Sequence, residues 1–393
     1  MSRLGGRIAA QARRFGPLPW SAFMDAALYD PDGGFYQAGG RAGRGGDFVT
    51  SPELGPLFAH LCAHALDRSW EELGRPDPFV VVEAAAGVGT LARDILAAGP
   101  ACGPALRYVL VERSAPLRAA QAGRLPLEQP AFVLGPADPA RDPDEDDARP
   151  VPGRGPLVTS LAELPALPLT GVIVANELMD NLPSDLLEWR GGRWHEVRVA
   201  AADQRSDELV ELVVPARPDL AAEAARLVAA PGELPEGARL PIQRAGAEWL
   251  RQALATVEAG RVILIDYADA SDALARRPSA EWLRTFRHHR AALSPLQAPG
   301  TQDITCVVAW DQLAEVRPPD DNRAQGDWLA DHGLNQLVEA ARAVWRERAG
   351  IGDLAALAAR SRVHEAEALT DPDGLGGHRV LEWEIGAPFR DRA

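Results

Sequence analysis

The stretch FVVVEAAAGVGTLARDIL, residues 79–96, constrains the fold more than any other part of the chain. It begins with a run rich in β-branched residues that predicts a buried strand, passes through a cluster of very small residues, and continues with helical periodicity. A strand that turns directly into a helix leaves the first amides of the helix unpaired. Small residues let a ligand approach those amides because no Cβ stands in the way. The stretch therefore predicts a ligand-binding turn at the carboxyl end of a strand.

Four segments predict parallel strands that are covered on both faces. Each is a short, apolar, β-branched run with an acidic residue at or near its end. The segments are FVVVE (79–83), RYVLVE (107–112), GVIVANE (171–177) and RVILIDY (261–267). A helical pattern follows each of the first two, the second with Ser114 as its predicted N-cap. Alternating strands and helices predict a doubly wound α/β sheet.

The chain is expected to divide into three parts, of which the middle one contains this sheet. Residues 1–70 form an N-terminal extension of helices and loops, and residues 71–270 form the core, with an insertion at about 185–260. Residues 271–393 complete the sheet and the substrate cleft. A chain of 393 residues is long enough for this arrangement or for two domains.

Composition narrows the classes of partner. The formal net charge of −15, with no basic cluster, disfavours nucleic acid and favours a basic substrate. Cys62, Cys102 and Cys306 form no CxxC pair, so we expect buried, unreactive thiols and neither a disulfide framework nor a metal site. No segment approaches the ~20 apolar residues of a membrane span. The N-terminus also lacks the apolar centre of a signal peptide, and we expect a cytoplasmic location.

Two cofactor classes use a strand, a glycine turn and a helix in this order. Dinucleotide enzymes carry GxGxxG, whereas S-adenosyl-L-methionine (SAM) methyltransferases carry an acidic residue followed by GxGxG. Here Glu83 precedes Ala85, Gly87 and Gly89, which fits the second pattern with Ala85 in place of the first glycine. Glu112 ends the next strand 23 residues after Gly89, where such folds bind ribose hydroxyls. The glycine turn and Glu112 together predict a nucleoside site.

Four groups of motifs then carry a resemblance to a known family. They are ALYDPDGGFY with GDFVTSPELGPLF, VEAAAGVGTLARDIL with VERSAPLRAAQ, VIVANELMDNLP, and LRTFRHH with PGTQDITCVV. In this order they resemble the class I SAM-dependent methyltransferases of the MidA family, the relatives of a mitochondrial complex I assembly-factor methyltransferase. The chain departs from the family pattern at Ala85, at Ala59 and His60, and at Met179.

The resemblance implies a Rossmann-like methyltransferase fold with SAM as its cofactor. It also implies a protein as methyl acceptor, since the mitochondrial member methylates an arginine of a complex I subunit. A respiratory-complex subunit is thus one expected partner. We expect no nucleic acid and no membrane insertion, and a homodimer remains open.

The same resemblance, together with the strand-end positions, supplies the candidate site residues. The cofactor-binding candidates are Glu83, Ala85, Gly87, Gly89, Thr90, Leu91, Glu112, Arg113, Asn176, Asp47, Thr50, Ser51 and Pro52. In TSPE, the pattern also predicts a helix that Ser51 caps, with Pro52 at its first position and Glu53 favoured by the dipole.

The catalytic candidates follow from the chemistry of an arginine acceptor. A guanidinium must lose a proton and be held with its lone pair aimed at the methyl group, which favours nearby carboxylates. The candidates are Glu177, Asp180, Glu53 and, as a base or an orienting group, His289. Asp266, Asp303 and Thr305 are further strand-end polar residues near the expected cleft. For each of them, a helix cap or a structural hydrogen bond is the alternative.

Three other functions stay open from the sequence alone. The fold does not fix the acceptor, so a small-molecule O- or N-methyltransferase is the nearest alternative. A non-catalytic assembly factor that keeps the SAM fold is the second, because Ala85 and the segment after Phe58 depart from the family pattern. A nicotinamide dehydrogenase is the third, and only the glycine-rich turn suggests it.

Overall fold

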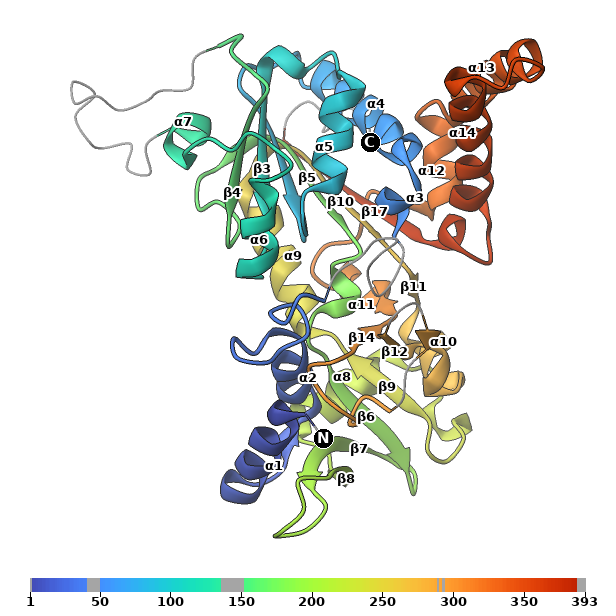
Figure 1. Ribbon diagram of the computed structural model, residues 1–393. Helices are drawn as coiled ribbons and strands as arrows, with labels where there is room; N and C mark the ends of the chain where they lie inside the picture. Colours follow the sequence, from blue (N-terminus) through green and yellow to red (C-terminus); the bar gives the residue numbers. More distant parts are fainter. Residues whose placement is uncertain (1, 41–49, 136–151, 288–289, 292–293, 387–393) are drawn as a thin grey trace. The chain divides into compact units, whose positions relative to one another are not determined.

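The computed structural model describes residues 2–40, 50–135, 152–287, 290–291 and 294–386 (Figure 1). Two candidate site residues, Asp47 and His289, lie outside these ranges. The chain forms two compact units, which are described separately. Unit 1 comprises Met1–Val49, Leu178–Arg251 and Asp266–Pro318, and unit 2 comprises Thr50–Glu177, Gln252–Ile265 and Pro319–Ala393. These units cut across the three parts expected from the sequence, and that division stays a prediction.

Unit 2 is built on a seven-stranded sheet in the order β16-β17-β10-β5-β2-β3-β4. The four neighbouring pairs from β10 to β4 are parallel, whereas β16 and β17 are antiparallel. The strands are β2 (Phe79–Ala84), β3 (Leu106–Val111), β4 (Leu157–Leu161), β5 (Leu169–Asn176), β10 (Val257–Asp266), β16 (Asp321–Ala324) and β17 (Arg379–Ile385). The four strands predicted from the sequence are β2, β3, β5 and β10, so the prediction of an α/β sheet is confirmed.

Helices flank this sheet. They are α3 (Ser51–Leu54), α4 (Pro56–Glu72), α5 (Thr90–Ala98), α6 (Ala115–Gln121), α7 (Pro130–Leu134), α12 (Gln325–Asp331), α13 (Leu334–Arg348) and α14 (Leu354–Thr370), with the 3₁₀ turns η1 (Gly103–Ala105) and η5 (Leu375–Gly377). Helix α9 (Arg244–Thr256) leads into β10. The predicted cap of α6 is confirmed, because the Ser114 hydroxyl accepts the N–H of Leu117 at 3.4 Å.

Helix α4 shows how the sequence builds the core of unit 2. Phe58, Leu61, Cys62, Ala65 and Leu66 recur at helical spacing and are all buried. Side chains alternate along the strands, so every second residue of β2, β3, β5 and β10 faces these positions. Helices α4 and α5 pack side by side in this layer (Figure 1). The packing fixes the carboxyl ends of the parallel strands, where the candidate residues lie.

Unit 1 contains mostly antiparallel strands. Its five-stranded sheet runs β1 (Leu18–Pro19), β7 (Arg193–Ala201), β6 (Asp185–Arg190) and β9 (Arg239–Ile242), with β8 (Leu209–Pro215) on β7. A three-stranded sheet consists of β13 (Arg290–Ala291), β12 (Leu283–Arg287) and β14 (Asp303–Cys306). A two-stranded sheet consists of β11 (Ala268–Asp269) and β15 (Val308–Ala309). Its helices are α1 (Arg3–Phe15), α2 (Trp20–Tyr29), α8 (Pro218–Leu227), α10 (Ser271–Arg276) and α11 (Trp310–Ala314), with the 3₁₀ turns η2 (Met179–Asn181), η3 (Pro231–Glu233) and η4 (Ser279–Glu281).

The insertion expected at about 185–260 supplies β6 to β9 of this sheet. Strands β6 and β7 form a hairpin whose two central residues, Gly191 and Gly192, have φ angles of +54° and +78°. Two left-handed residues match the right-handed twist of the flanking strands, and glycine adopts that conformation without strain.

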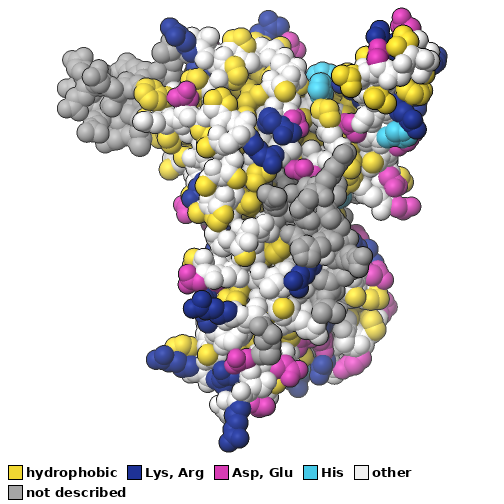
Figure 2. All heavy atoms as spheres, in the orientation of Figure 1, with side chains coloured by type: hydrophobic (Ala, Val, Ile, Leu, Met, Phe, Trp, Pro, Cys, Tyr) yellow, Lys and Arg dark blue, Asp and Glu magenta, His cyan; other side chains and the backbone are white. Residues whose placement is uncertain are grey.

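The surface is mixed in character. On the face in Figure 2, basic side chains are scattered among acidic and apolar ones. The α13–α14 hairpin exposes four large apolar side chains, which are Val344, Ile351, Leu354 and Leu357. Within the part of the chain that the structure describes, none of the helices has the length and apolar character needed to cross a bilayer.

Candidate functional site

The glycine turn lies where the carboxyl ends of three parallel strands meet. Ala84 of β2 is in register with Val111 of β3 and with Ala175 of β5. The turn is tied back to the sheet, since the Ala86 N–H donates to the Val111 carbonyl at 3.1 Å. It then closes through the Gly89 N–H, which donates to the Ala86 carbonyl at 2.8 Å. Helix α5 starts at the next residue, so its first amides face the strand ends.

Three residues of the turn have a left-handed backbone. Their φ angles are +57° at Ala85, +53° at Gly87 and +80° at Gly89. Ala85 is strained by on the order of 1 kcal/mol, because its Cβ disfavours this region. A Cβ built on Gly87 would meet no atom within 4 Å, whereas one on Gly89 would lie 3.1 Å from Leu125. Gly87 thus borders open space, and Gly89 serves close packing.

Glu112 holds the turn from the neighbouring strand end. Its Oε2 accepts the N–H of Gly87 at 2.9 Å, and its Oε1 accepts the N–H of Ser114 at 2.7 Å. Burial raises the pKa of Glu112, and these two N–H groups oppose the shift. Each carboxylate oxygen keeps a second lone pair. Glu112 can therefore brace Gly87 and accept hydroxyl donors of a ribose together.

Gln121 is a site residue that the sequence reasoning misses. Its amide Nε2 donates to the Gly87 carbonyl at 2.7 Å, and its Oε1 accepts the Ser160 hydroxyl at 2.5 Å. The side chain is fully buried. Gln121 ends the VERSAPLRAAQ motif, so the motif contained it, but no local pattern shows that its side chain turns back to the glycine turn.

Glu83 lies beneath the turn. Only 5% of the residue is exposed, and the Tyr108 hydroxyl donates to its Oε2 at 2.7 Å. Burial raises the pKa of Glu83 to about 8, against the opposing bonds from Tyr108 and the Ala92 backbone. The side chain thus links β2, β3 and α5. Its predicted contact with the cofactor stays a prediction.

The TSPE segment meets the start of α5. The Thr90 hydroxyl donates to Glu53 Oε1 at 2.8 Å and accepts from the Arg124 guanidinium at 3.1 Å. Two candidates that are 37 residues apart in the sequence, Glu53 and Thr90, are therefore in contact.

The predicted cap by Ser51 is wrong. Helix α3 begins at Ser51, with Thr50 at the N-cap position and no side-chain cap bond. The Ser51 hydroxyl is fully buried and donates to Gln325 Oε1 at 3.2 Å instead. Tertiary packing against Gln325 thus overrides the local cap. Thr50 is buried and Pro52 half-buried at the same helix start.

Two further cofactor candidates differ in their surroundings. Leu91 is buried and belongs to the apolar core that includes α4 and α5. Arg113 is exposed, directly after Glu112. Leu91 can therefore offer a ligand little beyond its backbone, whereas Arg113 lies at the surface.

Asn176 ends β5 and Glu177 follows it, beside the glycine turn. Glu177 has a φ of +52°, and its N–H donates to the Ile265 carbonyl at 2.8 Å. The Asn176 amide Nδ2 contacts Glu177 Oε1 at 3.3 Å. Its Oδ1 is buried and has no hydrogen-bond partner among the residues described. A buried acceptor without a partner and a left-handed glutamate both mark this strand end as a functional position.

A second polar cluster lies in unit 1. Its residues come from the motifs ALYDPDGGFY, VIVANELMDNLP and PGTQDITCVV and from the end of the strand RVILIDY. It contains Tyr36, Asp180, Asn181, Tyr267 and Asp303. The Tyr36 hydroxyl lies 2.9 Å from Asn181 Oδ1 and 3.1 Å from Asp303 Oδ1. Asn181 Nδ2 donates to the same Asp303 oxygen at 3.1 Å. The Tyr267 hydroxyl donates to Asp180 Oδ2.

Both carboxyl groups of this cluster are deeply buried. Asp180 is 2% exposed and Asp303 is 1% exposed. Burial raises the pKa of Asp180, and burial together with the nearby Asp180 charge raises the pKa of Asp303 to about 8. Asp180 Oδ1 and Asp303 Oδ2 each lack a hydrogen-bond partner in the described part of the chain. Two unused buried acceptors are suited to a cationic donor.

Asp266 fixes the backbone that carries Asp180. Its Oδ2 accepts the N–H groups of Met179 at 3.0 Å and of Asp180 at 3.2 Å. Thr305 is buried on β14, where its position pairs with Arg284. Asp266 and Asp303 therefore join the candidates through direct contacts, whereas Thr305 shows only strand pairing.

The three cysteines are buried and free, as expected. Burial raises the pKa of each, that of Cys306 to about 12. These thiols are therefore protonated at neutral pH and poor nucleophiles. Over the described ranges, no three His, Cys, Asp or Glu side chains are grouped so that they could hold a metal ion.

A family model of S-adenosyl-L-methionine-dependent methyltransferases matches residues 61–323, which is two thirds of the chain. The chain belongs to this methyltransferase family. Among curated proteins, the methyltransferase is 27% identical to the Drosophila melanogaster protein arginine methyltransferase NDUFAF7 homolog, mitochondrial. That alignment covers 80% of this chain and 70% of the relative. The human NDUFAF7 protein is also 27% identical, over 77% of this chain and 66% of its own length.

A solved structure agrees with the family. The methyltransferase resembles a crystal structure from Burkholderia thailandensis bound to S-adenosyl-homocysteine, with a TM-score of 0.78 and 27% identity. The match covers 98% of this chain and 92% of that one. SAM is therefore the cofactor of the methyltransferase, as predicted. The open space at Gly87 fits such a ligand, and so does Asn176 Oδ1, which has no partner in the described part of the chain.

The expected cytoplasmic location is wrong. The curated relatives from fly, mouse and human all carry mitochondrial names. A missing signal peptide says nothing about mitochondria, because targeting there relies on a different kind of segment.

Proposed function

We propose that this methyltransferase transfers the methyl group of SAM to an arginine side chain of a protein. One observation carries the choice of acceptor: Asp180 Oδ1 and Asp303 Oδ2 are buried and have no hydrogen-bond partner among the described residues. A guanidinium offers five N–H donors and a fixed positive charge, which matches such a pair. The names of the curated relatives, protein arginine methyltransferases, support the same choice.

The glycine turn and its neighbours would hold the cofactor. Gly87 borders the open space in which it would lie, Glu112 would accept its ribose hydroxyls, and Asn176 Oδ1 would accept an N–H donor. When bound, SAM supplies a methyl group attached to a positively charged sulfur. The sulfur is a leaving group that needs no acid catalysis. The protein's own task is then to position and deprotonate the acceptor.

Asp180 is the base in this proposal, and Glu177 is its neighbour along the chain. An arginine side chain is fully protonated at neutral pH, and its nitrogen attacks only as a proton leaves. Burial raises the pKa of Asp180, which makes its carboxylate a stronger proton acceptor than an exposed one.

The neighbours of Asp180 would orient the acceptor. Asp266 holds the η2 backbone by two N–H bonds, and Tyr267 donates to Asp180 Oδ2. The opposite oxygen, Oδ1, therefore remains for the substrate. Asp303, held by Tyr36 and Asn181, would supply a second contact to the same guanidinium, whose positive charge favours the ionised form of this carboxyl group.

The partner in this proposal is a protein, and a respiratory-complex subunit is the first to test because of the family resemblance. The acidic net charge of −15 suits an arginine-bearing, basic partner. A homodimer is also proposed, and size-exclusion chromatography with light scattering measures it.

The test incubates purified protein with SAM carrying a labelled methyl group and with extract from cells that lack the protein. We expect label in a discrete protein band and mass spectrometry that places one methyl on an arginine. Label that appears only in extractable small molecules would contradict a protein acceptor. Tight binding of S-adenosyl-homocysteine without any methylated product would instead point to a non-catalytic assembly factor.

A further inference from the structure

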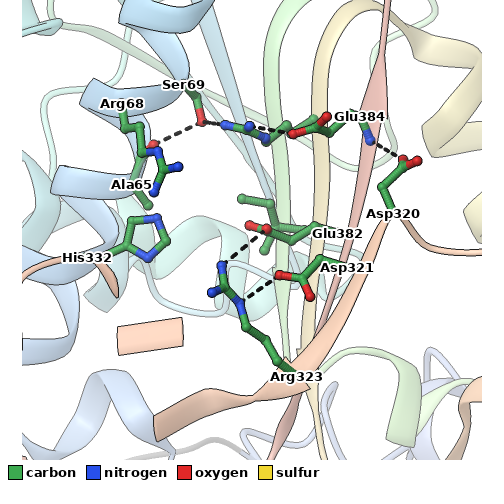
Figure 3. Close-up of a pocket in the computed structure, with 11 residues that line it drawn as sticks. Ala65, Arg68, Ser69, Asp320, Asp321, Arg323, His332, Glu382 and Glu384 are labelled. Carbon is green, nitrogen blue, oxygen red and sulfur yellow. Dashed lines mark hydrogen bonds and ion pairs between the residues drawn. The ribbon is translucent and has the colours of Figure 1, made fainter. Parts of the chain in front are cut away.

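Unit 2 contains a polar cavity that has no residue in common with the candidate cofactor site. It measures about 210 Å³, roughly the volume of seven liquid waters. Helix α4 contributes Arg68 and Ser69, strand β10 contributes Arg261, strand β17 contributes Glu382, and His332 follows α12 (Figure 3). The floor is the sheet itself, so the cavity interrupts a layer that is otherwise apolar.

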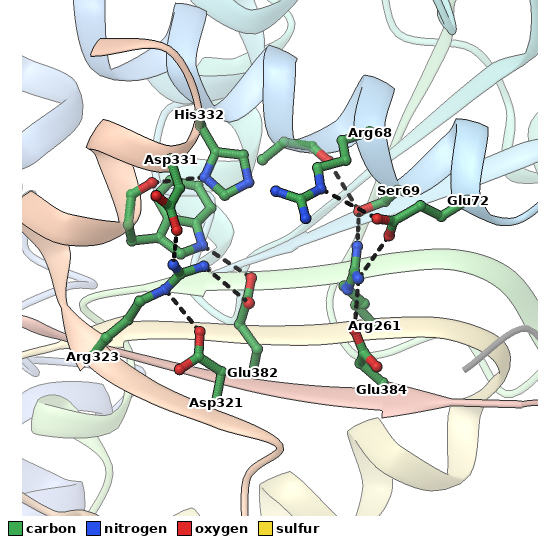
Figure 4. Close-up of polar contacts among 12 residues, drawn as sticks. Arg68, Ser69, Glu72, Arg261, Asp321, Arg323, Asp331, His332, Glu382 and Glu384 are labelled. Carbon is green, nitrogen blue, oxygen red and sulfur yellow. Dashed lines mark hydrogen bonds and ion pairs between the residues drawn. The ribbon is translucent and has the colours of Figure 1, made fainter. Parts of the chain in front are cut away.

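One end of the cavity is closed by a group of ion pairs around Arg261. Arg261 donates to the Ser69 hydroxyl at 3.1 Å and contacts Glu72 at 2.7 Å and Glu384 at 2.6 Å (Figure 4). The Arg261 side chain is 9% exposed. Its charge is met within the protein, and this group shapes the wall.

The other end is closed in the same way. Arg323 contacts Asp321 at 2.8 Å and Asp331, and lies 3.8 Å from Glu382. The Trp328 indole N–H donates to Glu382 Oε1 at 2.9 Å. Burial raises the pKa of Glu382, with Trp328 and Arg323 opposing the shift. A positive group placed beside Glu382 would favour its charged form further.

Between these ends, two side chains keep unused polar groups that face the cavity (Figure 3). Arg68 uses its Nε for Glu72 at 3.2 Å, and its two terminal amino groups have no partner among the described residues. His332 is 9% exposed, and its Nδ1 lies 2.7 Å from the Trp328 carbonyl. A carbonyl only accepts, so Nδ1 carries the proton. Burial lowers the His332 pKa to about 4, so the ring is neutral at pH 7 and Nε2 is an acceptor.

The cavity therefore offers donors on one side and acceptors on the other. Three arginines and four carboxylates line it. A plain anion would meet the carboxylates, and a plain cation would meet the arginines, so neither is complemented throughout. A molecule that carries both charges is complemented at both ends. Ala65 and Ile263 add a small apolar wall, enough for a short side chain.

We propose that this cavity binds a small free α-amino acid as its zwitterion. The carboxylate contacts the terminal amino groups of Arg68, and the ammonium group lies between Glu382 and His332 Nε2. The site is distinct from the one that holds SAM and independent of the choice of methyl acceptor. It would be a second ligand site on the α4 face of the sheet.

The test is isothermal titration calorimetry of the full chain with each common amino acid. Acetate and ethylamine serve as probes that carry only one of the two charged groups. We expect at least one small amino acid to bind with sub-millimolar affinity, and acetate and ethylamine to bind far more weakly. Arg68→Met keeps the aliphatic stem and should weaken binding by about tenfold or more.

A second variant and a matched control make the outcome decisive. His332→Phe keeps an aromatic ring packed against Trp328, at 4.2 Å between centroids, and removes Nε2, so it should also weaken binding. Arg342→Met removes an exposed arginine paired with Glu339 on α13 and should change nothing. Titration of every variant with S-adenosyl-homocysteine reports the cofactor site separately.

Four results would overturn the proposal. They are no heat with any amino acid at millimolar concentration, acetate binding as tightly as the amino acid, unchanged binding in both cavity variants, or loss of amino-acid binding when S-adenosyl-homocysteine saturates the protein. The last result would place the amino acid in the cofactor site. None of the four depends on whether an arginine is methylated.

Discussion

The glycine turn of unit 2 and the carboxylate cluster of unit 1 both bury acidic side chains, but they use them differently. At the turn, the Glu112 oxygens accept two backbone N–H groups, and Tyr108 donates to Glu83. In the cluster, Asp180 and Asp303 each retain one oxygen without a partner in the described chain. The first pair is satisfied within the protein, and the second is not.

This difference distinguishes carboxylates that support the fold from carboxylates that can take part in the reaction. A buried carboxylate that is fully hydrogen-bonded stiffens the backbone around it. One that keeps a free oxygen carries a desolvation cost, and a ligand that donates to it offsets that cost. We therefore expect changes at the turn to alter cofactor affinity, and changes in the cluster to alter turnover and pH dependence.

The largest effect is expected for Asp180→Asn. Asparagine keeps the shape and the bond from Tyr267 but cannot take a proton from a guanidinium. If Asp180 is the base, kcat should fall between about 100- and 10,000-fold while the affinity for S-adenosyl-homocysteine stays unchanged. Single-turnover methyl transfer to the identified acceptor measures the first quantity, and calorimetry measures the second.

Asp185→Asn is the matched control for this variant. Asp185 is also buried in unit 1, but Ser21 donates to it at 2.7 Å and Arg217 lies 3.5 Å away. The control should keep its kcat and lose only some stability. Equal losses of kcat in the two variants would mean that the cluster supports the fold and does not act as a base.

The next largest effect is a change in how stability depends on pH. Folded Asp303 holds a proton up to about pH 8, whereas the unfolded chain releases it near pH 4. Between these values the folded state binds more protons, so the free energy of unfolding falls as the pH rises. Asp303→Asn removes this contribution. The stability of the variant relative to wild type should therefore rise by about 1.4 kcal/mol per pH unit within that window.

Urea denaturation at several pH values measures this slope. Asp203→Asn is a suitable control, because Asp203 is exposed and the N–H groups of Arg205 and Ser206 lower its pKa. Its curve should run parallel to wild type between about pH 5 and 8, where the group is ionised in both states. A parallel curve for Asp303→Asn as well would show that Asp303 is ionised in the folded protein.

A smaller effect is expected at the turn, for Glu112→Gln. The amide places an N–H donor against the Gly87 or Ser114 N–H, and it removes the charge that favours ribose hydroxyls. Affinity for S-adenosyl-homocysteine should weaken by about tenfold, or roughly 1–2 kcal/mol. Glu128→Gln, at an exposed position, should bind like wild type. Unchanged affinity in Glu112→Gln would leave the carboxylate a purely structural role.

The sequence predicts the strands of this sheet well where they are apolar and poorly where they are not. Strands β2, β3, β5 and β10 are rich in valine, leucine and isoleucine, and burial on both faces requires such apolar segments. Strands β4 (LVTSL) and β16 (DNRA) are short or polar, and they join the sheet only through pairing with β3 and β17. Because pairing with a neighbouring strand defines them, these two edge strands are hard to predict from their own residues.

The residues of the candidate site likewise fall into those that the sequence predicts and those that it does not. Gly87, Gly89 and Glu112 are recognisable because the spacing of one strand, turn and helix fixes them. The contact between Tyr36 and Asp303 joins residues 267 positions apart, and no local pattern can predict it. Gln121 and Ser51 show the same limit, since tertiary partners decide where their side chains point.

The smallest expected effect concerns Ala85, where the family pattern has glycine. Ala85 has a φ of +57°, and Ala230, which belongs to unit 1, has a φ of +47°. Replacing either by glycine relieves backbone strain but adds entropy to the unfolded chain, so both should gain about 0.5–1 kcal/mol in urea denaturation. Only Ala85→Gly also frees the approach to the turn, and only it should bind S-adenosyl-homocysteine more tightly, by about two- to threefold. Equal affinities in the two variants would show that the Ala85 methyl group does not face the cofactor.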